Sequence, residues 1–114
     1  MTRDLVIVSQ RGLTVGDLSA AVAAVHQGMP WTVVDRGDRL AVHHCDQPLI
    51  EASPSQRLDD WAEVAELFPD GTKVLSPAWC TTLTVAQDAD LALGIEVARA
   101  AAWQTDGELA MLQP

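Results

Sequence analysis

The feature that most restricts the fold is a run of four consecutive apolar residues near the N-terminus, Leu5-Val6-Ile7-Val8. A continuous run of this length, rich in β-branched side chains, is typical of a strand buried in a core. Asp4 and Ser9 bound the run, so it is far shorter than the roughly 18–20 apolar residues of a membrane span. We therefore predict a buried strand over residues 4–9, no membrane segment, no export signal and a cytoplasmic location.

Three further segments show helical spacing. In the first, Thr14 and Asp17 resemble a capping box, and Leu18, Val22 and Val25 follow on one face. In the second, Ser53-Pro54 is typical of an N-cap followed by proline at the first helical position. The predicted helices are 14–27, a second from Ser53-Pro54 to Pro69-Asp70-Gly71, and a third from Asp88 or Asp90 to Gln104, closed by Gly107.

Extended patterns predict the remaining elements. A hairpin joins strands at 31–34 and 39–45, a short edge strand occupies 49–52, and further strands follow at 78–85 and 108–112. The order is β-α-β-β-α-β-α-β. We predict a single α+β domain over residues 1–114, a two-layer sandwich with helices on one face of a mixed or antiparallel sheet. The specific expectation is a ferredoxin-like variant.

The charge balance limits the classes of partner that we expect the chain to bind. Sixteen acidic residues against seven basic ones give a formal charge of −9, and 48% apolar residues suffice for a core. Such a chain repels duplex nucleic acid and anionic membranes and attracts basic proteins. Residues 35–70 hold nine acids and three arginines, which places most of the excess on one segment.

The most chemically suggestive run is His43-His44-Cys45-Asp46. In a strand, His43 and Cys45 share a face, and with Cys80 they would form an N/S/S set suited to zinc, or a thiol nucleophile with a histidine base. Local spacing supplies only two of the three groups. We favour the alternative, a strand with one small buried cysteine and a half-exposed histidine pair, and predict no metal, cofactor or catalytic residue.

Two surface features are candidates for partner binding. Asp59, Glu63 and Glu66 fall at i, i+4 and i+7 with Asp60 beside them, a carboxylate stripe that is either solvated decoration or a docking surface for cations. Trp103 falls on the more polar side of the third helix, where it either covers the sheet edge, which we favour, or anchors a partner. The third helix also has a broad apolar face, which either the domain itself or a second copy in a homodimer covers.

The C-terminal half resembles a known kind of protein. The motifs are Pro48-Leu49-Ile50-Glu51-Ala52, an acidic helix ending Leu67-Phe68-Pro69, then Ser76-Pro77-Ala78-Trp79, and an alanine-rich helix closed by Thr105-Asp106-Gly107-Glu108-Leu109. This arrangement looks like small acidic actinobacterial α/β proteins and is similar in style to immunity proteins of polymorphic toxin systems. The resemblance covers about 65 residues and implies an acidic segment that covers the active site of a toxin.

Three hypotheses follow from these observations. The first is a non-catalytic immunity-type protein that neutralises a basic toxin through Asp59, Asp60, Glu63, Glu66 and Trp103. The second is a ferredoxin-like regulatory module that binds a small molecule. The third is a small thiol or metal enzyme that uses His43, His44, Cys45 or Cys80.

Overall fold

The computed structural model describes residues 3–25, 31–58, 61–72, 74, 78–86 and 89–111. In chain order these residues form β1 (Arg3–Ser9), α1 (Val15–Val25), β2 (Trp31–Asp35), β3 (Leu40–His44), β4 (Gln47–Ala52), β5 (Gln56–Leu58), α2 (Trp61–Leu67), β6 (Ala78–Val85), α3 (Leu91–Gln104) and β7 (Glu108–Met111). One seven-stranded sheet has the order β2-β3-β4-β6-β1-β7, and β5 pairs with β6. All of these pairings are antiparallel, which confirms an α+β architecture.

The strand β1 lies between β6 and β7 and is buried from Leu5 to Ser9, as the apolar run predicts. Alternate side chains of a strand point to opposite faces. Leu5 and Ile7 belong to the main core under α1 and α3, whereas Val6 and Val8 join a second cluster that contains Val64 of α2. The chain therefore buries both faces of its central strand.

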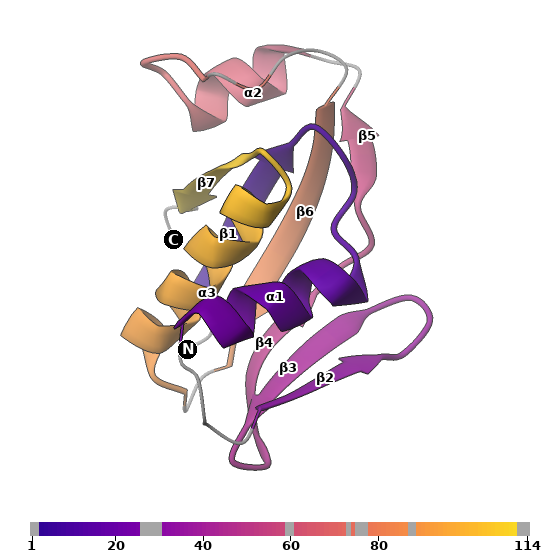
Figure 1. Cartoon of the computed structure of the whole chain (residues 1–114). Helices are drawn as coiled ribbons and strands as arrows, with labels where there is room; N and C mark the ends of the chain where they lie inside the picture. Colours follow the sequence, from indigo (N-terminus) through magenta and orange to yellow (C-terminus); the bar gives the residue numbers. More distant parts are fainter. Residues whose placement is uncertain are drawn as a thin grey trace.

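The placement of α2 corrects the two-layer prediction. α1 and α3 lie side by side on one face of the sheet (Figure 1). α2 packs through Val64 against Val6, Val8 and Ala78, on the opposite face. A helix shorter than predicted carries this contact, because β5 occupies the segment where the sequence indicated the first turns of the helix.

The reason that residues 53–58 are extended lies in their bonds to β6. The backbone N–H of Ser53 donates to the Thr82 carbonyl oxygen (2.9 Å), and the hydroxyls of Ser55 and Thr81 are 2.7 Å apart. These serines satisfy groups of the sheet instead of capping a helix. β4 and β5 thus pair with successive parts of the same edge of β6.

The predicted edge strand is an interior strand, since β4 lies between β3 and β6. Pro48 cannot donate a ladder hydrogen bond, and the register between β3 and β4 shifts between Val42 and His43, next to the His43–Pro48 pair. The ferredoxin-like topology is not confirmed: β3, β4 and β6 separate β1 from β2, whereas a split β-α-β unit has one strand inserted. β6-α3-β7, with β1 between its strands, is such a unit.

The broad apolar face of α3 is covered within the domain. Its buried residues are Gly94, Val97, Ala98, Ala101 and Ala102, and the helix packs on α1 as well as on the sheet. Asp90 caps its start by accepting a hydrogen bond from the Leu93 N–H (3.3 Å). Among the described helices, none combines the length and the apolar character needed to cross a bilayer.

Candidate partner-binding site

The end of α3 is a tight turn that sets the position of its last side chains. The backbone N–H of Asp106 donates to the Trp103 carbonyl oxygen (3.3 Å), and that of Gly107 donates to the Ala102 carbonyl oxygen (2.8 Å). Together these bonds form a Schellman motif, which satisfies carbonyls that the helix leaves open. The sequence indicated Gly107 as the stop, but the residue in the left-handed conformation is Asp106, with φ of 53°.

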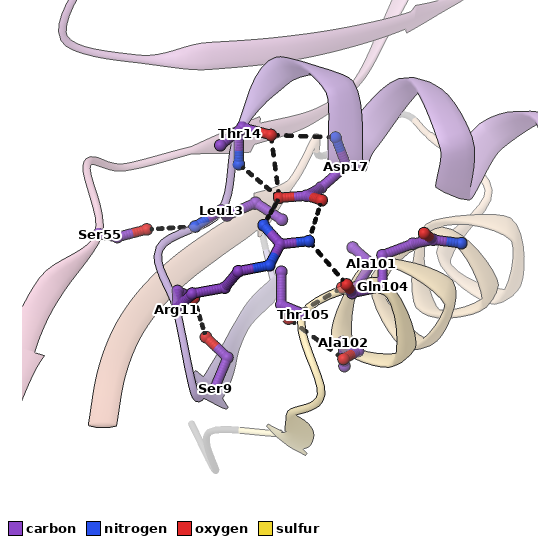
Figure 2. A network of polar contacts seen from close by, with 10 residues as sticks. All are labelled: Ser9, Arg11, Leu13, Thr14, Asp17, Ser55, Ala101, Ala102, Gln104 and Thr105. Carbon is purple, nitrogen blue, oxygen red and sulfur yellow. Dashed lines mark hydrogen bonds and ion pairs between the residues drawn. The ribbon is translucent and has the colours of Figure 1, made fainter. Parts of the chain in front are cut away.

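Gly107 serves a different purpose, the close approach of this turn to β1. A Cβ atom at Gly107 would lie 2.5 Å from the Val8 carbonyl oxygen and 2.7 Å from Ser9 Cβ. Thr105, fully buried beside it, shares its hydroxyl proton between the carbonyl oxygens of Ala101 and Ala102, both at 3.1 Å (Figure 2). The end of α3 is therefore fixed against the central strand.

Trp103 projects from this fixed turn into solvent with 79% of its surface exposed, which makes it the most exposed large apolar residue of the described chain. The expectation that it packs on the sheet edge is therefore wrong. Ala101 and Ala102, and not Trp103, lie on the buried side of the last helical turn. An indole held in water on a rigid helix end is the kind of residue that anchors a protein partner.

Two hollows border Trp103. The larger, about 720 Å³, is the Trp103 recess; it lies between the loop after α2, the last turns of α3 and the start of β7, and its lining is Asp70, Gly71, Thr72, Arg99, Ala102, Trp103, Gly107, Glu108 and Leu109. The smaller, about 340 Å³, is lined by Gln10, Trp103, Asp106 and Gly107. The recess is wide open to solvent, so it is a surface depression that a partner's side chain can contact and not an enclosed ligand pocket.

The charge around Trp103 is predominantly negative. Among the described lining residues, Asp70, Asp106 and Glu108 supply three carboxylates to the two hollows, and Arg99 supplies one guanidinium. Asp70, Asp106 and Arg99 are exposed, and Glu108 is half-buried. In the sequence, Asp70 marks a helix end, and Asp106 and Glu108 belong to the segment that closes the third helix. None of the four residues was predicted to bind a partner, because only the fold brings them together.

The predicted carboxylate stripe is only partly described. Glu63 and Glu66 are exposed on α2, and Asp59 and Asp60 lie outside the described residues. Glu63 is close enough to Cys80 that, after burial, its charge is the second cause raising the pKa of that thiol. The part of the α2 region that reaches Trp103 is the loop that follows the helix, Asp70–Thr72, rather than Glu63.

The histidine and cysteine residues do not assemble into one site. Cys45 is exposed in the two-residue turn between β3 and β4, with φ of 52°, so it does not share a strand face with His43. Cys80 lies on β6, which β4 separates from β3. Within the described residues, no three histidine, cysteine or acidic side chains are grouped as a metal site requires.

A smaller contact does form at that turn. Cys45 Sγ is 3.6 Å from His44 Nε2, and the His44 ring lies 4.8 Å from the Trp31 ring, centroid to centroid. These contacts join a thiol to one imidazole at the end of a hairpin.

The loop between β1 and α1 is structural. The Asp17 carboxylate is nearly buried. It accepts hydrogen bonds from both terminal nitrogens of Arg11 (2.7 and 2.6 Å) and from the Thr14 backbone N–H (2.9 Å) (Figure 2). The Thr14 hydroxyl accepts in return from the Asp17 N–H (3.2 Å), which confirms the capping box. Arg11 also donates to the carbonyl oxygen of Gln104 on α3 (2.9 Å), so its guanidinium is committed within the fold and not to an external anion.

Comparison of the chain with protein-family models, curated proteins and solved structures finds no match.

Proposed function

We propose that this chain is a small, non-catalytic binding protein of the immunity type, which neutralises a basic protein partner in the cytoplasm. The observation that supports the proposal is Trp103, an indole with 79% of its surface exposed. Tryptophan is enriched among the residues that dominate binding energy in protein interfaces. A rigid, exposed indole is a suitable centre for such an interface.

The charge indicates the kind of partner. A net charge of −9 attracts a basic protein over distance and raises its association rate, and the carboxylates of Asp70 and Asp106 at the indole favour cations locally. Glu63 and Glu66 add exposed negative charge on α2, and the proposed interface includes this part of the predicted stripe.

The test is co-expression with the products of the two genes that flank the gene of this protein. We expect one of them to carry a cationic C-terminal domain, to arrest growth when expressed alone, and to be neutralised by the wild-type chain. Trp103→Ala should weaken the purified complex at least tenfold, because an interface anchor is lost while the fold keeps its core. The double reversal Glu63→Lys/Glu66→Lys should weaken it further at low salt and flatten its salt dependence.

The matched control is Val15→Ala, which truncates the second exposed large apolar residue of the described chain, 38% exposed on α1. It should bind as the wild type does. Flanking gene products that are not toxic, or that do not bind, overturn the immunity proposal. Equal binding by Trp103→Ala and Val15→Ala overturns the proposed surface.

A further inference from the structure

We infer that the Trp103 recess binds an arginine side chain of the partner, and that Arg99 is an internal cation that competes for the same carboxylates. The inference rests on the proposed function for the source of the arginine. Its chemistry rests on the described lining of the recess: an exposed indole, two carboxylates and one guanidinium around a hollow of about 720 Å³.

The indole and the carboxylates of the recess favour different properties of a ligand, namely a cation that can stack on a ring and a group that can donate hydrogen bonds. An exposed indole face attracts a cation through the ring quadrupole, and tryptophan does so best among the aromatic residues. Asp70, which is exposed, and Glu108, which is half-buried, line the same recess from two other elements and place negative charge in its lining. A planar guanidinium meets both demands at once, because it stacks on a ring while its N–H groups remain in plane to reach carboxylates.

Lysine fits this combination less well. Its ammonium is a strongly hydrated point charge that does not stack and does not form paired, parallel hydrogen bonds. A surface that selected by charge alone would treat lysine and arginine as equals. Preference for arginine is therefore the property that separates the recess from a general acidic surface.

Arg99 has a distinctive place in this arrangement. It precedes Trp103 by four residues, so both lie on one side of α3, and both line the recess. Its positive charge lowers the net negative charge of the described recess lining. A partner arginine must share or displace it, so removal of Arg99 is expected to strengthen binding.

Two probes test the inference: acetylated, amidated peptides of alternating glycine and arginine, or of alternating glycine and lysine, with equal charge. Binding is followed by NMR, with the Trp103 indole N–H and the Gly71 and Gly107 amides as reporters of the recess. The arginine peptide should bind at least threefold more tightly. Trp103→Ala should remove that preference, which a purely structural or long-range charge role would not do.

Matched variants separate local from overall charge. Arg99→Gln and Arg36→Gln each remove one exposed arginine, but Arg36 belongs to the turn after β2, at the sheet edge opposite β7. About five strand spacings, roughly 24 Å, separate those edges, well beyond the screening length at physiological salt. Arg99→Gln should tighten peptide binding about threefold and Arg36→Gln should leave it unchanged; likewise, Asp70→Asn should weaken binding and Asp38→Asn, in the same distant turn, should not.

The possible results distinguish failure of the arginine site from failure of the proposed function. Equal binding of the two peptides, shifts centred on Glu63 and Glu66 in place of Gly71 and Gly107, or equal effects of Arg99→Gln and Arg36→Gln overturn the arginine site. If the flanking gene product binds the chain but the peptides are not distinguished, only this inference fails. If the arginine peptide binds at the recess and neither flanking product binds, the proposed function fails and the arginine site stands.

Discussion

Asp17 joins three parts of the molecule, and its removal is the most direct test of how they hold together. Its carboxylate is 8% exposed and receives both ends of the Arg11 guanidinium, which in turn bonds to the Gln104 carbonyl oxygen at the end of α3. The same carboxylate accepts the backbone N–H of Thr14 at the start of α1. Asp17→Ala therefore releases the β1–α1 loop, the first turn of α1 and a tie to α3 together.

The expected loss follows from these bonds. The carboxylate half of the capping box contributes about 1 kcal/mol, and a charge-assisted hydrogen bond to a nearly buried carboxylate adds about 1.5 kcal/mol. Arg11 is half-exposed in the ion pair, so it regains water and leaves no buried unpaired charge. We expect Asp17→Ala to lower the free energy of unfolding by about 2.5 kcal/mol, and Asp17→Asn, which keeps an acceptor for Thr14, by about 1.5 kcal/mol.

The pH dependence gives an independent check. The hydrogen bond from Arg11 is the largest cause that lowers the pKa of Asp17 below its usual value, against a smaller opposing effect of burial. A folded-state pKa below the unfolded one means that the stabilisation is complete above about pH 4 and is lost as pH falls through the folded pKa. The difference between wild type and Asp17→Ala should be constant from pH 7 to pH 5 and shrink below about pH 4.

Urea denaturation followed by tryptophan fluorescence and far-UV circular dichroism measures this difference at each pH. The relief of overall negative charge at low pH is nearly common to both proteins and largely cancels. A loss below about 0.5 kcal/mol at pH 7, typical of an ordinary surface substitution, would refute the argument from the network. So would a difference that persists unchanged at pH 3. Arg11→Ala should cost less in the Asp17→Ala background than in the wild type.

Two further predictions concern the close approach at Gly107 and the two thiols. Gly107→Ala should lower the free energy of unfolding by at least about 2 kcal/mol in the same urea assay, because its Cβ would lie 2.5 Å from the Val8 carbonyl oxygen. Gly16→Ala on α1, where the nearest atom is 3.7 Å away, should be neutral or slightly stabilising, and equal losses would contradict the clash. Cys45 is exposed, whereas burial raises the pKa of the Cys80 thiol. Iodoacetamide at pH 7.5 should therefore label Cys45 first, and mass spectrometry that finds Cys80 labelled first would contradict this order.

The local patterns of the sequence predicted much of the fold. The apolar run, the Thr14–Asp17 capping box and the strand 78–85 correspond to β1, the start of α1 and β6. The errors arise where long-range pairing overrides a local signal. Ser53-Pro54 is a sound helix start in isolation, but the hydrogen bond between Ser53 and Thr82 extends the chain along β6 instead.

The site was harder to predict for a related reason. Trp103 and the acidic helix were recognisable as surface candidates, but the recess is made by residues distant in the sequence, with Asp70 about 30 positions from Arg99 and Trp103. Only the packing of the loop after α2 beside the end of α3 brings them together. The exposure of Trp103 depends in turn on which side of the last turn is buried, and the alanines at 101 and 102 decide that.

The conformation of Asp106 connects stability with the proposed binding. Glycine adopts the left-handed conformation without cost, whereas aspartate accepts it with some strain, so Asp106→Gly should stabilise the protein by up to about 1 kcal/mol. The substitution also removes a carboxylate beside Trp103 and should weaken binding of the arginine peptide. Asp46→Gly is the matched control, because Asp46 is exposed and left-handed too, with φ of 63°, but lies in the β3–β4 turn. It should give a similar gain in stability with no change in peptide binding. If Asp106→Gly destabilises the protein, the strain argument is wrong; if both variants lose binding equally, the carboxylate acts only through overall charge, and the turn after α3 has no special part in recognition.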